Sequence, residues 1–153
     1  MIASRASNRG LTIIELLVVL AVGAVLMAVG TPVLRGAMVE QRLNSGATDV
    51  SSALSEARRE AFRTSEVARV EVDPADGRIS VFSRDATTDT IVERRRIYLP
   101  TGVVFNNLAA VTSYTFDTLG RPAALPMTVQ VRTVDTNVVR TVTVLGSGRV
   151  SIT

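Results

Sequence analysis

The ionisable side chains of this 153-residue chain are almost all carboxylates and guanidiniums. It contains 14 Asp and Glu and 17 Arg, but no His, Cys or Lys. Histidine and cysteine supply the usual catalytic triads and zinc ligands. We therefore expect no enzyme, no metal site and no cofactor, and any function must follow from where the charges are placed.

One carboxylate is unusual because it stands at the start of a long apolar run. Glu15 is followed by Leu16–Leu34, a stretch in which no residue is charged. As a helix this stretch spans about 29 Å at roughly 1.5 Å per residue, close to the thickness of a bilayer's hydrocarbon core. A carboxylate inside a bilayer is costly, so a chain that needed only an anchor has no reason to keep Glu15.

The segment before the apolar run is short, polar and basic. Its sequence, MIASRASNRG, holds Arg5 and Arg9 and no acid. Positive residues before an apolar segment stay in the cytoplasm, so we expect the rest of the chain across the membrane. Three interpretations compete: a signal peptide cut after residues 28–30, a plain signal anchor, and a prepilin-type leader cut before the apolar run. Only the third explains a carboxylate at this place.

Residues 10–20, GLTIIELLVVL, resemble the prepilin signal of type IV pilins and type II secretion pseudopilins. In that signal a Gly precedes the cut, an apolar residue and often Thr follow, and Glu is the fifth mature residue. The resemblance implies that a prepilin peptidase cuts after Gly10 and methylates the new amine of Leu11. Leu11 departs from the usual Phe but keeps the apolar character that the position requires.

The same resemblance implies that Glu15 acts in assembly. Cleavage would leave a cationic amine on Leu11, and Glu15 of an incoming subunit would pair with the amine of a neighbour. Pairing removes the cost of a lone carboxylate in lipid. We assign Thr12 and Pro32 to the same assembly segment. Pro32 would be the twenty-second mature residue, a position where pilins commonly carry proline. Pro32 predicts a kink or local melting of the helix, with helix termination as the alternative.

Apolar residues then recur at steps of three and four, the periodicity of an amphipathic helix. They are Val39, Leu43, Ala47, Val50, Leu54, Ala57 and Ala61. We expect one long helix, with residues 11–34 in the membrane or filament core and residues 35–63 as its amphipathic continuation, after a leader at 1–10. A short heptad coiled coil is the alternative, but the sequence that follows is β-like.

From Val67 onward, short β-type runs alternate with turn signals. Residues 64–153 are therefore predicted to form an antiparallel sheet, or two sheets, packed against the helix in an α+β fold. The run 91–99 lacks a clean apolar face and is expected at a sheet edge. Asp73 and Asp76 fall in the segment DPADG, which predicts a turn; two acids are too few for a calcium site.

The C-terminal half resembles the GspH/FimT family of minor pseudopilins and minor pilins. The matching segments are YTFDTLGRP (114–122) and the final GSGRVSIT. In that family a Phe-x-x-x-Gly turn, here Phe116 and Gly120, precedes a final hairpin, and residues like Gly-Arg-Val close the chain, here 148–150. The resemblance implies a type IV pilin-like fold, a long N-terminal helix with a transmembrane first half packed on an antiparallel β domain.

This resemblance also implies partners and a location. The partners are the prepilin peptidase, other pilin or pseudopilin subunits and inner-membrane lipid, with no small-molecule substrate. The chain would cross the bacterial inner membrane once, with its C-terminal domain in the periplasm, before it enters a pilus or pseudopilus. Whether that fibre is a type IV pilus or a type II secretion pseudopilus stays open, as does the position in it.

Some family members linked to natural competence bind DNA through basic residues near the C-terminus, which gives an alternative function. Residues 94–153 hold seven Arg and two acids, and phosphate binding needs such charges on one face. Solvated strand faces are the other interpretation, and the tail lacks the second Arg of a Gly-Arg-x-Arg sequence. The candidate DNA-binding residues are Arg121, Arg132, Arg140 and Arg149.

Overall fold

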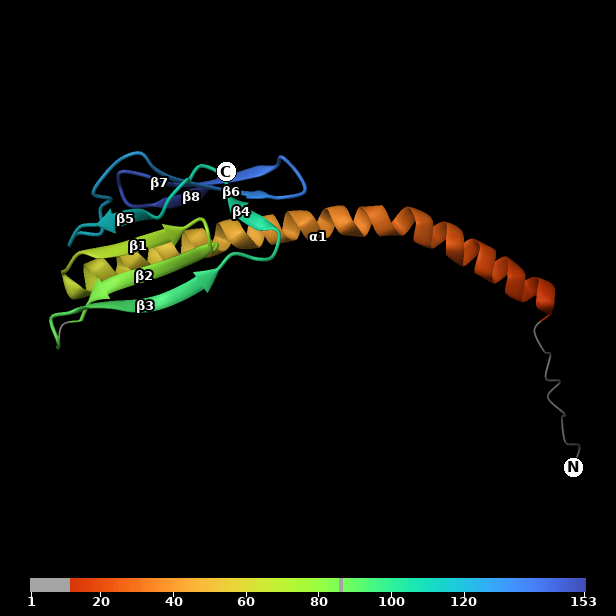
Figure 1. Ribbon diagram of the computed structural model, residues 1–153, viewed down its shortest axis with the longest axis horizontal. Helices are drawn as coiled ribbons and strands as arrows, with labels where there is room; N and C mark the ends of the chain where they lie inside the picture. Colours follow the sequence, from red (N-terminus) through yellow and green to blue (C-terminus); the bar gives the residue numbers. More distant parts are fainter. Residues whose placement is uncertain (1–11, 86) are drawn as a thin grey trace, which may run out of the picture. The chain divides into compact units, whose positions relative to one another are not determined.

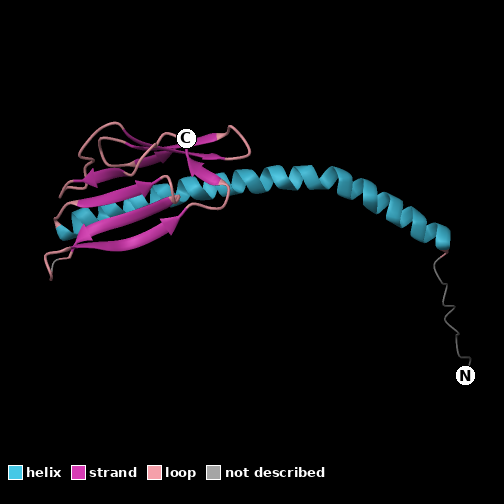
Figure 2. Cartoon of the chain, in the orientation of Figure 1, coloured by secondary structure: helices cyan, strands magenta, loops and turns pink. Residues whose placement is uncertain are grey.

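The computed structural model describes residues 12–85 and 87–153. The chain divides into two units, Met1–Met38 and Val39–Thr153. Helix α1 (Ile13–Thr64) begins in the first unit and ends in the second, and the eight strands of the described residues all lie in the second unit (Figures 1 and 2). The expected fold class, a long N-terminal helix with antiparallel sheets, is confirmed.

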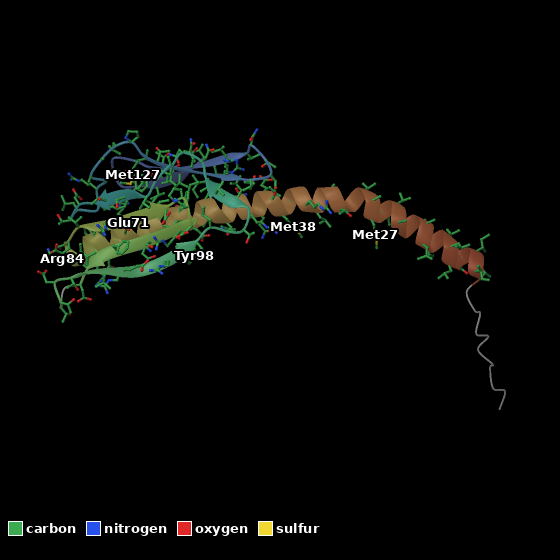
Figure 3. All side chains as sticks on the ribbon, in the orientation of Figure 1. Met27, Met38, Glu71, Arg84, Tyr98 and Met127 are labelled. Carbon is green, nitrogen blue, oxygen red and sulfur yellow. The ribbon has the colours of Figure 1, made fainter. Side chains whose placement is uncertain are left out.

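The first unit is a helix that is apolar on all sides. The large apolar side chains from Ile13 to Leu34 are between 54% and 81% exposed, and Figure 3 shows Met27 and its neighbours projecting from the ribbon. Within the described part of the chain, α1 is the one helix long and apolar enough to cross a membrane. The helix is unbroken at Pro32, so termination there is wrong, while the kink stays a prediction.

In the second unit, the predicted apolar stripe of α1 forms one side of the core. Six of its seven members, from Leu43 to Ala61, are buried, and Val39 is half-buried. Small residues on this side of α1 let strands approach closely. Gly46, next to the stripe residue Ala47, shows this most clearly, since a Cβ there would lie 3.1 Å from Cγ1 of Val103.

The strands form two four-stranded antiparallel sheets, as the sequence predicts. In the first sheet the order is β3 (Ile91–Tyr98), β2 (Arg78–Arg84), β1 (Ala68–Asp73) and β5 (Thr112–Phe116). In the second sheet the order is β4 (Val103–Phe105), β6 (Met127–Thr133), β7 (Val139–Val144) and β8 (Val150–Ile152). The prediction that residues 91–99 form an edge strand is confirmed by β3.

Both sheets turn one face towards the helix (Figure 1). Burial alternates along β1 and along β6, because successive side chains of a strand point to opposite faces. The inward residues join the stripe of α1 in a single apolar core, in which Phe116 and Leu54 are among the largest fully buried side chains. Ala61 of α1, Phe116 of β5 and Val150 of β8 all belong to this core or pack against it. The core therefore joins the C-terminal end of α1 to β5 and β8.

Candidate functional site

Thr12 caps the start of α1. Its hydroxyl accepts a hydrogen bond from the backbone N–H of Glu15 at 3.3 Å, and its carbonyl oxygen accepts one from the N–H of Leu16 at 3.2 Å. Threonine followed three residues later by glutamate is the sequence of a capping box. The helix therefore begins next to Leu11, and Glu15 lies in its first turn, where the helix dipole favours a negative charge.

The two processing residues of the sequence prediction cannot be placed. Gly10 and Leu11 lie outside the described residues, so the pairing of the Leu11 amine with Glu15 stays a prediction. Thr12 and Glu15 are both exposed. The sequence carries the capping signal in Thr12 and Glu15, three residues apart, within the segment that resembles the prepilin motif.

The three consecutive arginines of β3 are paired with acids of the same unit. Arg94 donates to Asp85 at 3.2 Å, and Arg95 donates to Glu56 of α1 at 2.8 Å. Arg96 forms a two-pronged hydrogen-bonded pair with Glu93. These contacts account for three of the seven arginines that give residues 94–153 their positive excess.

A partly exposed network joins the last turns of α1 to β2. Glu60 accepts hydrogen bonds from Arg63 at 3.1 and 2.6 Å and from the hydroxyl of Ser83 at 3.2 Å. The bonds from Arg63, more than those from Ser83, hold the pKa of Glu60 below its ordinary value. Arg94 lies 3.8 Å away and also favours the charged form. These contacts engage the Glu60 carboxylate within the fold.

Arg140 is engaged with the helix. Its Nε donates to Oδ1 of Asn44 at 3.1 Å, and its Nη2 donates to Glu40 at 3.4 Å. Arg140 pairs in register with the buried Val131, so it points to the inner face of the second sheet. Its charge is therefore directed at α1 rather than at a ligand.

Arg132 lies apart from the other candidates. It follows Val131 on β6 and so points to the outer face of the sheet. It pairs with Val139, whereas the β7–β8 turn that carries Arg149 begins at the opposite end of the ladder, beside Met127. Five residues of strand separate the two ends, about 17 Å at roughly 3.3 Å per residue. The structure does not bring the four predicted DNA-binding arginines onto one face.

Two of the four candidates, Arg121 and Arg149, lie on turns that contact each other. Each of them follows the glycine of its turn. Gly120 and Gly148 both have left-handed backbones, with φ of 67° and 79°. A Cβ on Gly148 would lie 2.5 Å from the carbonyl oxygen of Gly120, so the two turns are in contact. Arg121 and Arg149 follow directly, and both are exposed.

A pocket of about 590 Å³ lies at this place, between the last turns of α1 and the turn before β8. Its cationic residues are Arg58, Arg59 and Arg149. The remaining lining residues are Ser55, Phe62, Leu119, Gly148 and Val150. The sequence does not reveal that Arg58 and Arg59 belong to this site. They lie beside Arg149 only because the turn before β8 packs against α1 in the folded chain.

Across residues 12–85 and 87–153, His, Cys, Asp and Glu form no group of three that could hold a metal ion. The acids of the DPADG segment make a turn: Asp73 accepts the N–H of Ala75 at 3.1 Å and the guanidinium of Arg78 at 3.1 Å. Gly77 follows with a φ of 62°. The predicted turn between β1 and β2 is confirmed.

Comparison with known proteins supports the resemblance at the N-terminal end of the chain. Residues 5–31 match the family model of the prokaryotic N-terminal methylation motif. No curated protein sequence matches the chain.

Solved structures with the same fold are minor pilins and pseudopilins. The type IV minor pilin FimU of Pseudomonas aeruginosa is 18% identical, with a TM-score of 0.59 over 74% of this chain and 90% of that one. The minor pseudopilin EpsH of the Vibrio cholerae type 2 secretion system is 14% identical, with a TM-score of 0.59 over 73% of this chain and 96% of that one. These likenesses establish a pilin-type fold and agree with the resemblance drawn from the sequence.

Proposed function

We propose that this chain is a minor pilin or pseudopilin, a subunit of a type IV pilus or a type II secretion pseudopilus. The observation that carries the proposal is the methylation motif at residues 5–31 on a chain with a pilin-type fold. Neither feature alone is sufficient, because the motif covers only the N-terminus and the fold is shared at low sequence identity. The protein acts by assembly, and no catalysis of its own is required.

The proposal implies an order of insertion, processing and assembly for the subunit. It is inserted once into the inner membrane, with its N-terminus in the cytoplasm and Val39–Thr153 in the periplasm. A prepilin peptidase cuts after Gly10 and methylates Leu11. The subunit then leaves the lipid for the core of the fibre, where the exposed apolar side chains of α1 are covered by other subunits. As a minor subunit it primes assembly at or near the tip.

The first experiment is the intact mass of the protein from cells with and without the prepilin peptidase. We expect loss of residues 1–10 and gain of one methyl group only when the peptidase is present. An uncut chain, or a chain cut after Gly30, would contradict the proposal.

Within the fibre, Glu15 pairs with the methylated amine of a neighbour. The N-cap at Thr12 supports this, because it places Glu15 in the first turn of α1, three residues after the cap. Replacing Glu15 with Gln removes the charge at constant shape, so incorporation into the fibre should fall sharply. Glu40→Gln is the matched control, since Glu40 is an exposed glutamate of the same helix with only a surface ion pair, which contributes little. Normal incorporation of Glu15→Gln would contradict the pairing.

DNA uptake is the rival proposal for the same fold. It depends on Arg121 and Arg149, which lie on adjacent turns, without support from Arg132 and Arg140. The test is binding of a short duplex to the full chain in detergent at low and high salt, because phosphate contacts are salt-dependent. Arg121→Ala with Arg149→Ala should abolish binding, while Arg132→Ala should leave it intact. No binding at low salt would exclude this function, and gene neighbours would separate a retracting pilus from a secretion pseudopilus.

A further inference from the structure

The pocket at the end of α1 combines cations and apolar side chains from three segments that are far apart in the sequence. Arg58, Arg59 and Phe62 come from α1, and Leu119 and Arg149 come from the two glycine turns. Its volume of about 590 Å³ is in the range of sites that bind small molecules or a few side chains.

The backbone holds Arg58 in the wall of this pocket. A Cβ on Gly120 would lie 3.1 Å from Cγ of Arg58, and one on Gly148 would lie 2.7 Å from Nε of Arg58. Both glycines therefore lie against the arginine stem where any other residue would displace it. The side chain enters the pocket already ordered, which lowers the entropy that a ligand must overcome.

No acid in the part of the chain that the structure describes neutralises the charge of the pocket. Among the acids that the structure describes, none lies within 4.0 Å of the guanidinium of Arg58, Arg59 or Arg149. Arg63, one turn further along α1, is by contrast paired with Glu60. Three cations that share a recess repel one another, and an anion placed between them gains charge-assisted hydrogen bonds.

The pocket also exposes apolar surface. Phe62 is 70% exposed and Leu119 is 58% exposed, although both are large and lie beside the cations. Arginine and aromatic residues together are typical of the few positions that carry most of the binding energy at protein interfaces. A ligand that offers only charge would leave this apolar surface in water.

We propose that this pocket binds an acidic segment of a neighbouring subunit in the fibre, a carboxylate side chain flanked by an apolar one. The carboxylate would lie between Arg59 and Arg149, and the apolar side chain would cover Phe62 and Leu119. This inference rests on the proposed function, because the neighbour is a subunit of the same fibre.

A protein segment fits the pocket better than a nucleic acid does. A nucleic acid needs a track of cations along its backbone, and the track ends here, because Arg132 is at the far end of the second sheet and Arg140 is turned towards α1. The site is one recess with an apolar wall, which suits one or two side chains.

The test places a benzophenone amino acid at Leu119 in the full chain, expressed in its host, followed by ultraviolet crosslinking and peptide mass spectrometry. It is repeated with Arg59→Glu, with Arg149→Glu and with the control Arg132→Glu, which changes the same charge at the far end of the second sheet. Arg59 and Arg149 are exposed, so the variants should fold, and protease resistance checks this. Intact mass and the fibre fraction are read in the same samples.

We expect a crosslink to a peptide of another fibre subunit that carries Asp or Glu beside an apolar residue. Arg59→Glu and Arg149→Glu should each lower the crosslink yield at least about tenfold, whereas Arg132→Glu should not. Replacing the partner's acid with Arg should restore the yield in the two variants that lost it. Three outcomes would overturn the pocket proposal alone, in a chain that enters the fibre. They are the absence of a crosslink, a crosslink that Arg149→Glu does not weaken, and a crosslink to lipid or nucleic acid. A chain that stays uncut and outside the fibre overturns the proposed function, and the pocket's occupant falls with it.

Discussion

At Gly148 three segments of the chain meet, and a side chain at this position has no room. The residue has a φ of 79°, and its missing Cβ would touch the carbonyl oxygen of Gly120 and the guanidinium of Arg58. The backbone conformation and the close approach are separate reasons for glycine. They can be measured separately, because Gly102 has a φ of 84° but no atom within 4 Å of its missing Cβ.

Replacing Gly148 with Ala should therefore destabilise the protein more than replacing Gly102 with Ala. Both changes force an L-residue into a left-handed conformation, at about 1–2 kcal/mol. Only Gly148→Ala adds a steric clash, at about 1–3 kcal/mol more. Urea unfolding of the full chain in detergent measures the difference, and equal destabilisation by the two variants would show that the contact with Arg58 is loose.

Glu60 makes the stability of the second unit depend on pH. Hydrogen bonds from Arg63 lower its pKa below the ordinary value of 4.5, so the folded state favours the charged form. The stabilisation is present above pH 4.5 and is lost as pH falls through the folded pKa. Glu93 adds an effect of the same sign, because the hydrogen bonds from Arg96 lower the pKa of Glu93 to about 2.

We expect the free energy of unfolding to decline as pH falls below about 4.5. Glu60→Gln should cost about 1 kcal/mol at pH 7 and should flatten this decline. Asp76→Asn is the control, since Asp76 is exposed and has no ion pair among the described residues. Unfolding curves at pH 3 to 7 measure the free energy of unfolding at each pH. If its dependence on pH were the same in Glu60→Gln as in the original chain, the Glu60 carboxylate would not be stabilised by its hydrogen bonds in the folded state.

At the scale of elements, the buried stripe of α1 carries most of the helix's contribution to stability. Leu54 is 1% exposed, whereas Phe62, two turns later, is 70% exposed. Leu54→Ala should destabilise the protein by about 2–5 kcal/mol, because it leaves a cavity in the core. Phe62→Ala should change stability by about 0.5 kcal/mol or less while it weakens the crosslink at the pocket. Thermal unfolding measures both, and a large loss in Phe62→Ala would mean that Phe62 belongs to the core.

The elements that sequence predicts well are those whose signal is local. The stripe of α1 and the edge position of β3 follow from periodicity and from misplaced charges within a few residues. The pocket could not be predicted, because it depends on the register that brings Gly148 to Arg58. The four arginines near the C-terminus looked like one cluster for the same reason. A count along the chain does not show that Arg140 is paired with Glu40 and Asn44 of α1.

At the scale of the whole molecule, the core of the described residues lies in the second unit alone. The buried apolar residues of the described chain begin at Leu43, inside the second unit. The large apolar side chains from Ile13 to Leu34 are exposed, and an apolar surface of this size marks a contact with a membrane or another protein. A lipid or protein environment for this part of α1 therefore follows from its exposed apolar surface.

Removing residues 1–38 should consequently leave a soluble, folded domain. The fragment 39–153 keeps every core residue, both sheets and the contact between Glu40 and Arg140, and it loses the surface that demands lipid. We expect it to stay monomeric without detergent, to show mixed α and β circular dichroism, and to unfold cooperatively within a few degrees of the full chain in detergent. Leu54→Ala in the fragment should lower its midpoint as it does in the full chain. A fragment that aggregates or melts without cooperativity would show that the first unit contributes to folding as well as to anchoring.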